Sequence, residues 1–247
     1  GPQSGAWRIL RPLGSGGMGT VYLAEREGDG YVQHGALKRI KRGMDSDAVL
    51  ARFRQERRIL SRLGHPNIAR LLDGGIAGDG RPFLVMEHVE GEPLSAWSAR
   101  ADTQVAARID LVLALCAADA HAHHQLVVHR DIKPANVIVS ADGTPRLLDF
   151  GIARLLEPDS GDATATATAA RFVTRAYAAP EQWQGLAVTT ATDIYQLGAL
   201  LHELLSGSRF AGVPGDTTQR PADRPATSTA GALRGDIGDV VAPATGA

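Results

Sequence analysis

The sequence predicts an α+β protein with two lobes: a small sheet-rich lobe at the N-terminus, and a larger, mainly helical lobe after it. Residues 7–40 alternate apolar and polar side chains around glycine-rich turns, as strands do. Residues 103–125 and 191–205 instead repeat apolar side chains at helical spacing. With 247 residues and an apolar fraction of 44%, the chain is long enough to form one large domain or two small lobes.

The composition limits the kinds of binding partner and the cellular location that we expect for this protein. The formal net charge is −1, so there is no electrostatic reason to expect nucleic acid or an anionic membrane as a partner. The single Cys116 excludes an intramolecular disulfide framework and favours a reducing, cytoplasmic location. This fragment has no apolar run of about 18 residues, so we expect no membrane span within it. A region outside these residues could still anchor a longer protein.

In the first lobe we expect a helix over residues 46–63. Its apolar stripe includes Phe53, Leu60 and Leu63, and Glu56 lies on the same stripe. A buried carboxylate is costly unless a cation meets it, so we expect Glu56 to have a basic partner. The expected strands are residues 7–13, 21–27, 35–40, 68–77 and 82–89.

In the second lobe we expect helices over 103–125 and 191–205, with a hairpin over 137–150 between them. Asp119 falls beside the expected apolar face of the first helix, so we expect it to reach water. Residues 159–170 are small and polar without periodicity, which is typical of a mobile loop. The apolar face expected for the first helix consists of Ile109, Val112, Leu113, Cys116, Ala117 and Ala120.

Four histidines cluster at positions 121, 123, 124 and 129. We find no cysteine pair or carboxylate at ligand spacing beside them, so we expect no metal site there.

Polar side chains interrupt a valine-rich stretch at residues 127–139, VVHRDIKPANVIV. Asp131 could accept or orient a hydroxyl proton, Lys133 could steady a phosphoryl group, and Asn136 offers an amide oxygen to a divalent ion. Asp149 ends a later apolar strand and can bind Mg²⁺, because hard cations prefer carboxylate oxygen. This spacing suggests a catalytic site rather than a simple turn.

A glycine-rich stretch, GSGGMGTVY, lies at residues 14–22 between two expected strands. Glycines allow backbone N–H groups to approach phosphates without a side-chain clash. A dinucleotide-binding motif needs a helix after the glycines, and here a strand follows, so that interpretation fails. Lys38 ends the next strand, and an ion pair with Glu56 would fix its ammonium group over a phosphate.

The ordered set GSGGMG, GALK, Glu56, HRDIKPAN, DFG, APE and DIYQLG resembles the eukaryotic-type (Hanks-type) protein kinases, in particular bacterial serine/threonine kinases. The resemblance spans about residues 7–205 and implies a bilobal kinase-like fold. It places a cleavage remnant or tail at 1–6, an N-lobe at 7–86, a hinge at 87–92 and a C-lobe at 93–247. The activation segment would be residues 149–181.

The resemblance also implies roles for individual residues. Asp131 would be the catalytic base, assisted by Lys133, Lys38 and Asn136, while Asn136 and Asp149 would bind Mg²⁺ or Mn²⁺. Lys133 is typical of kinases that act on serine or threonine, and Thr174 matches a threonine near the catalytic aspartate. Leu60, Leu71, His129 and Phe150 match an apolar column anchored by Asp193. ATP would contact Gly14, Ser15, Gly16, Gly17, Gly19, Val21, Ala36, Lys38, Glu56, Met86, Glu87, Val89 and Ile138.

The implied partners are ATP and the serine or threonine hydroxyls of protein substrates. Arg130, directly before Asp131, suggests autophosphorylation of the activation segment at one or more of Thr164, Thr166 and Thr168. The alternative for that threonine-rich segment is a plain solvated linker.

Three positions or regions depart from the family pattern. Val173 replaces a glycine, and Gly35 replaces a valine, which could loosen the third strand. We expect the C-lobe to be truncated at its end, so that Glu181 lacks the arginine partner that the resemblance implies. We therefore expect either an incomplete lobe or a homodimer that covers the exposed surface.

Two other functions compete with the kinase hypothesis. A nucleotide-binding pseudokinase or scaffold is the first, although Lys38, Asp131, Asn136 and Asp149 are all present. A kinase for a small molecule, such as an antibiotic, is the second, but such enzymes lack the APE segment and the lysine after the aspartate.

Overall fold

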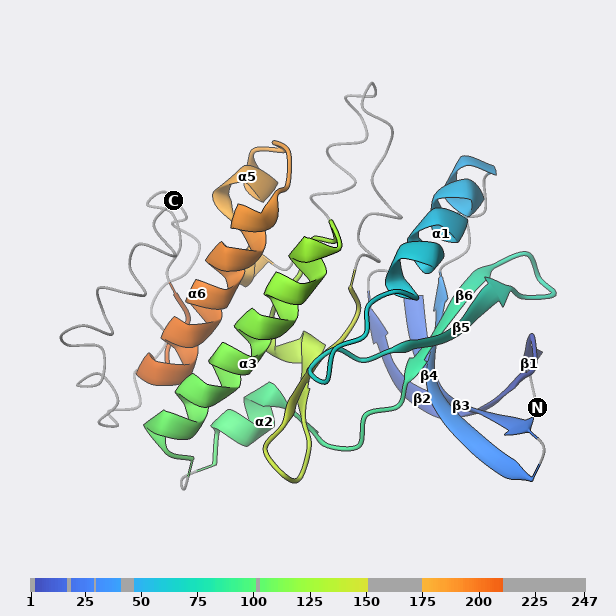
Figure 1. Ribbon diagram of the computed structural model, residues 1–247, viewed down its shortest axis with the longest axis horizontal. Coiled ribbons are helices and arrows are strands. Elements are labelled where there is room, and N and C mark those ends of the chain that lie inside the picture. The colour runs from blue at the N-terminus through green and yellow to red at the C-terminus, as the bar shows by residue number, and fades with distance from the viewer. Residues whose placement is uncertain are drawn as a thin grey trace.

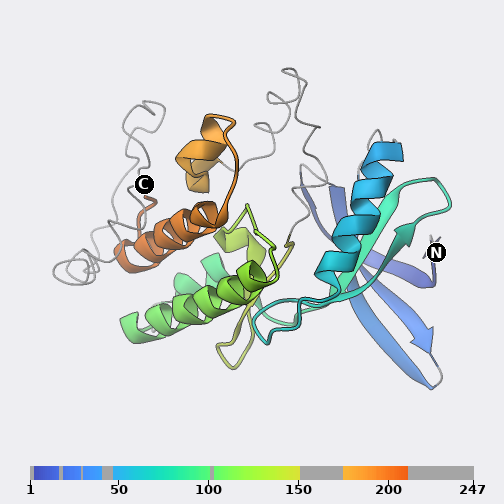
Figure 2. The same ribbon diagram turned by 45° about the horizontal axis from the view of Figure 1, so that its top comes forward.

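The computed structural model describes residues 3–16, 19–28, 30–40, 47–100, 103–150 and 175–210 (Figure 1). These residues form a sheet with one helix beside it and, separately, a group of helices around a small second sheet (Figures 1 and 2). The expected α+β bilobal fold is therefore confirmed.

The N-terminal part is a six-stranded sheet in the order β1-β2-β3-β4-β6-β5, and all of its neighbouring strands are antiparallel. Helix α1 (Asp47–Leu60) lies along it. The expected strands and helix are all present, with ends that differ by a few residues. The strands are β1 (Gln3–Ser4), β2 (Trp7–Gly16), β3 (Gly19–Gly28), β4 (Tyr31–Ile40), β5 (Leu71–Ile76) and β6 (Pro82–Glu87).

Two apolar clusters stabilise this lobe. One contains Trp7, Leu37 and Val85, all fully buried. The other joins the apolar stripe of α1, including Phe53 and Leu60, to the core of the C-terminal lobe. The expected stripe is confirmed, and it links the two lobes through continuous packing.

Gly35 does not interrupt β4, because it pairs with Ala24 on one side and Glu87 on the other. A Cβ atom at this position would lie 2.5 Å from a methyl group of Val85 and 3.0 Å from the ring of Trp7. The buried side chains of Trp7 and Val85 therefore occupy the space that a side chain at position 35 would need.

Part of the segment expected to be a tail is ordered. Ser4 and its neighbour Gln3 form β1, which pairs with Trp7 and Arg8 of β2. Ser4 is fully buried, and its hydroxyl accepts a hydrogen bond of 3.2 Å from Arg39.

The C-terminal part is built on the long helices α3 (Val105–His124) and α6 (Thr190–Ser206), which lie side by side (Figures 1 and 2). A sheet in the order β7-β8-β9 carries the polar stretch at one end of these helices. The remaining elements are β7 (Glu92–Pro93), α2 (Leu94–Ser98), η1 (Pro134–Asn136), β8 (Val137–Val139), β9 (Pro145–Leu147), η3 (Arg175–Tyr177) and α5 (Pro180–Trp183).

The prediction of which face of α3 is buried is wrong, except at Val112. Leu113 and Cys116 are exposed, and the buried face instead includes Asp119, which is only 3% exposed. The helix is rich in alanine and leucine on all sides, so its sequence gives a weak period, and α6 selects which face is covered. The buried residues are Leu111, Val112, Leu115, Ala118, Asp119 and Ala122.

None of the helices among the described residues combines the length and the apolar character needed to cross a membrane.

Candidate active site

Lys38 on β4 and Asp149, just after β9, meet at the junction of the two lobes. The Lys38 Nζ lies 2.7 Å from Asp149 Oδ2, although the residues are 111 positions apart in sequence. Lys38 is 8% exposed, so its ammonium group is largely removed from water and held by this carboxylate. A cation from the sheet and a possible metal ligand from the helical lobe therefore share one location.

Asp131 is fixed by two neighbours in the same loop. Lys133 Nζ lies 2.6 Å from Asp131 Oδ2, and the Asn136 amide nitrogen donates to the same oxygen at 3.1 Å and to the Asp131 carbonyl at 2.7 Å. Both hydrogen bonds of Asn136 use its nitrogen, which leaves the amide oxygen able to bind a cation. The three residues expected to act together are thus in contact.

Hydrogen bonds join this loop to the segment that carries Asp149. The Leu148 N–H donates to the Asn136 carbonyl at 2.8 Å. His129 Nε2 donates to the Leu148 carbonyl at 2.8 Å, while its Nδ1 accepts from the Asp131 N–H at 3.2 Å. With one ring nitrogen donating and the other accepting, His129 is a neutral imidazole that orients the backbone on both sides.

Asp193, in the first turn of α6, anchors the catalytic loop. It is fully buried, and its two oxygens accept the N–H groups of His129 and Arg130, each at 2.7 Å. These bonds support a left-handed backbone at Arg130, where φ is +73°. Asp149 also has a positive φ of +62°. Such strained positions persist when their surroundings fix them, and they cluster at functional sites.

The glycine-rich hairpin faces this junction from β2 and β3. Gly19 has a φ of +154°, and a Cβ atom there would lie 2.0 Å from the Arg39 carbonyl oxygen, so only glycine fits. Val21 pairs with Lys38, and Ala36 pairs with Met86 at the end of β6. The hairpin, the lysine and the segment after β6 are therefore adjacent in one sheet.

Comparison with known proteins agrees with this geometry. The family model described as "Protein kinase domain" matches residues 7–227. The chain belongs to the protein kinase family. Among curated proteins, this kinase domain is 40% identical over 207 residues to serine/threonine-protein kinase pkn2 of Myxococcus xanthus. It is 37% identical over 216 residues to serine/threonine-protein kinase PknA of Mycobacterium tuberculosis.

The kinase domain covers only part of these relatives. The match with pkn2 takes in 82% of this chain and 24% of the relative, and the match with PknA 85% and 49%. The crystal structure of the Mycobacterium tuberculosis PknI kinase domain superposes with a TM-score of 0.69 at 28% identity, covering 98% of this chain and 88% of that one. These matches identify a bacterial serine/threonine kinase domain, as the sequence motifs indicated.

The apolar column expected from the family pattern is present. Leu60 and Phe150 belong to one buried cluster, and Leu71 packs against it. The rings of His129 and Phe150 lie 4.5 Å apart between centroids. The column connects α1, β5 and the catalytic loop, and hydrogen bonds to Asp193 hold its lower end.

Two glutamines near the site were missed by the sequence analysis. Gln196 on α6 accepts the N–H of Ile132 at 2.7 Å and donates to the Arg130 carbonyl at 3.1 Å. Gln182 on α5 donates to the same carbonyl at 2.8 Å. The sequence did contain a signal for Gln196, because this residue belongs to the DIYQLG motif and lies three residues after Asp193.

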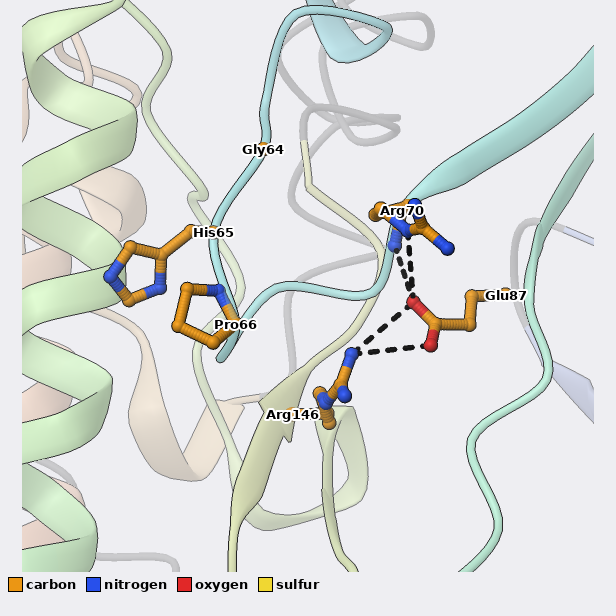
Figure 3. Close-up of a pocket in the computed structure, with 6 residues that line it drawn as sticks. All are labelled: Gly64, His65, Pro66, Arg70, Glu87 and Arg146. Atoms are coloured by element: carbon orange, nitrogen blue, oxygen red, sulfur yellow. Dashed lines mark hydrogen bonds and ion pairs between the residues drawn. The ribbon is translucent and has the colours of Figure 1, made fainter.

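A pocket of about 280 Å³ lies where the hinge segment begins (Figure 3). Glu87 pairs there with Arg146 of β9, 3.2 Å away, and with Arg70 at 3.6 Å. The pocket falls below the range of about 300–1,000 Å³ typical of small-molecule sites, and its centre is an ion-pair network. We therefore do not take this pocket as the nucleotide site. Its ion pairs connect the start of the hinge with both lobes.

The buried environment of Asp119 was also missed. Burial raises the pKa of Asp119 to about 8, with the neighbouring carboxylate of Asp193 as the next cause. The pKa of His123 is raised chiefly by its hydrogen bond to Asp193. Asp119 lies four residues before His123, so the statement that no carboxylate accompanies the histidines at ligand spacing was wrong.

Glu181 has a partner in this structure, since it accepts a hydrogen bond from the Thr192 hydroxyl. Several expected site residues lie outside the described part of the chain, so the structure does not place them. These are Gly17, Thr164, Thr166, Thr168, Val173 and Thr174, together with the side chain of Glu56 and the C-terminal residues 211–247.

Proposed function

We propose that this kinase domain transfers the γ-phosphoryl group of ATP to serine and threonine hydroxyls of proteins. The observation that carries the proposal is the convergence of Lys38 with Asp149 beside a loop in which Lys133 and Asn136 hold Asp131. Phosphoryl transfer depends mainly on positioning and on neutralising charge, and this set provides both.

The residues fit the nucleotide that the family implies. Gly19 lets the glycine-rich hairpin lie directly against β4, where a Cβ atom would meet the Arg39 carbonyl oxygen, and Lys38 of the same strand pairs with Val21 two residues further on. Lys38 would bind the phosphates, while Glu87 and Val89 would meet the adenine through their backbone. In the nucleotide-bound domain, Lys38 would share its charge between phosphate and Asp149.

The donor set also fits a divalent metal ion. Asn136 offers an amide oxygen and Asp149 a carboxylate, and such hard oxygen ligands suit Mg²⁺, with Mn²⁺ as a close substitute. When bound, the ion would neutralise charge on the phosphates. Asp131 would then orient the substrate hydroxyl and accept its proton, and Lys133 would steady the transferred group.

The test compares Asp131→Asn with Asp142→Asn, a matched exposed aspartate in the next turn. With Mg²⁺ and radiolabelled ATP, we expect Asp131→Asn to lower transfer to a protein substrate about 10²–10⁴-fold, because general base assistance is lost. Nucleotide binding should persist. Equal transfer by Asp131→Asn and wild type would contradict the proposal, and binding without transfer in wild type would favour the pseudokinase alternative.

We also propose that the domain phosphorylates itself at one or more threonines between residues 160 and 174. The support is the sequence, in which Arg130 precedes Asp131 and threonines are frequent in this segment. Mass spectrometry after incubation with Mg·ATP should locate phosphate there. The absence of phosphate from residues 160–174 would contradict the proposal.

A further inference from the structure

Three potential metal ligands, none of them assigned a direct part in phosphoryl transfer, meet between α3 and α6. His123 Nε2 lies 2.9 Å from Asp193 Oδ2 and 3.2 Å from Asp119 Oδ1. One ligand atom from each residue lies within 4.8 Å of the others. Asp119 and His123 are four residues apart on one helix, the spacing that lets two side chains on one helical face bind the same ion.

The cluster lacks positive charge for its burial. Asp193 is fully buried and Asp119 is 3% exposed, and the ion-pair partner that the described residues give to both is His123. One imidazolium can compensate only one of two ionised carboxylates, so without an ion one of the two must hold a proton. In addition, Asp119 Oδ1 is buried, and its 3.2 Å contact with His123 Nε2 lacks hydrogen-bond geometry among the described residues.

A divalent ion would supply the positive charge that the two carboxylates need and would also bind the buried Asp119 oxygen. Zinc binds histidine nitrogen and carboxylate oxygen at about 2.0–2.2 Å, so neighbouring ligands in a tetrahedral site lie roughly 3.3 Å apart. The two distances from His123 Nε2 are close to that spacing. A doubly charged ion with a neutral imidazole and two carboxylates makes the cluster neutral, and it gives Asp119 Oδ1 a bond in place of its poorly aligned contact with His123.

We propose that Asp119, His123 and Asp193 bind one divalent transition-metal ion of the zinc type. Asp193 can bind the ion and still accept the N–H groups of His129 and Arg130, because a carboxylate has about four lone-pair sites. The His123 side chain is 16% exposed, so a water molecule can supply a fourth ligand. The ion would tie α3 to the catalytic loop's anchor, which makes the site structural.

The test titrates the chelator-treated 247-residue chain with Zn²⁺, using calorimetry and thermal melting. We expect one ion per chain at this site and a higher Tm with zinc, because ligands that bind the folded state stabilise it. Asp119→Asn and Asp119→Leu should weaken binding at least about 100-fold, since losing a ligand exceeds the loss of an outer-shell partner. Circular dichroism checks that each variant is folded.

Two control variants separate this site from other zinc binding. His124→Ala removes an exposed histidine next to His123 and should leave the affinity unchanged. Asp149→Asn should also leave the zinc affinity of this site unchanged, which distinguishes the site from the proposed active-site metal. The proposal is overturned if wild type and Asp119→Asn bind zinc equally. It is also overturned if zinc leaves the wild-type Tm unchanged while Asp119→Leu is more stable without metal, which would mean that the cluster holds protons only.

Discussion

At the scale of single residues, the site depends on side chains and backbone conformations that fix one another. Arg130 and Asp149 adopt left-handed conformations that side chains rarely take, and Arg130 is held by hydrogen bonds to Asp193. The neutral His129 connects the two segments. We expect that removing a group proposed to bind the phosphates affects transfer more than folding.

Lys38→Met should lower phosphoryl transfer about 100-fold or more, because a preorganised charge on the phosphates is lost. Methionine fills similar volume on β4, so the Tm should change little. Radiolabelled transfer and thermal melting check the two expectations. Arg54→Met, on the exposed face of α1, is the matched control, and normal turnover by Lys38→Met would rule out the assigned role.

At the scale of elements, two features depend on packing that the local sequence does not predict. Helix α3 buries Asp119 because α6 covers that face. Strand β4 contains Gly35 because Trp7 and Val85 fill the space beside it.

Gly35→Val should reduce the free energy of unfolding by about 1–3 kcal/mol, although valine favours strands. The added Cβ would clash with Val85 and Trp7. Urea denaturation measures the change. Gly78→Ala is the control, because nothing lies within 4 Å of a Cβ at Gly78; a stabilised Gly35→Val variant would disprove this packing.

Thr189→Ala should cost about 1 kcal/mol of stability, because Thr189 caps α6, the helix that carries Asp193. Its hydroxyl accepts from the Ala191 N–H at 3.3 Å, and its own N–H donates to Thr192 at the same distance. Chemical denaturation of Thr189→Ala and of the neighbouring exposed Thr190→Ala tests this expectation. Equal losses in both variants would show that the cap contributes nothing specific.

At the scale of the whole molecule, the lobes are joined by the packing around Phe53 and Leu60 and by ion pairs at the hinge. Glu87 is the last residue of β6, and Arg146 belongs to the sheet of the other lobe. Figure 3 shows Arg70 and Arg146 converging on the same carboxylate. Both arginines are partly exposed, so water and salt weaken these interactions.

A double-mutant cycle of Glu87→Gln and Arg146→Gln should give a coupling energy of about 0.2–1 kcal/mol that falls as salt increases. Urea denaturation of the two single variants and the double variant measures it at low and high salt. A coupling above about 2 kcal/mol would indicate a pair far more shielded from water than this structure shows.

The sequence by itself determined the two-lobed fold, the order of the elements and the residues of the candidate site. Glycines, aspartates and an asparagine at fixed spacing are local signals, and the alternation of apolar residues identified the strands. The stripe of α1 was predicted because its apolar and charged residues contrast clearly along the helix.

Only the tertiary structure decided which face of α3 is buried, where Lys38 finds its partner and why Gly35 is tolerated. The alanine- and leucine-rich α3 gives almost no local preference, so its orientation depends on contact with α6. Asp149 approaches Lys38 from 111 residues away, and the space at Gly35 is occupied by Trp7 and Val85. Each of these outcomes depends on packing between segments distant in sequence, which local residue patterns cannot specify.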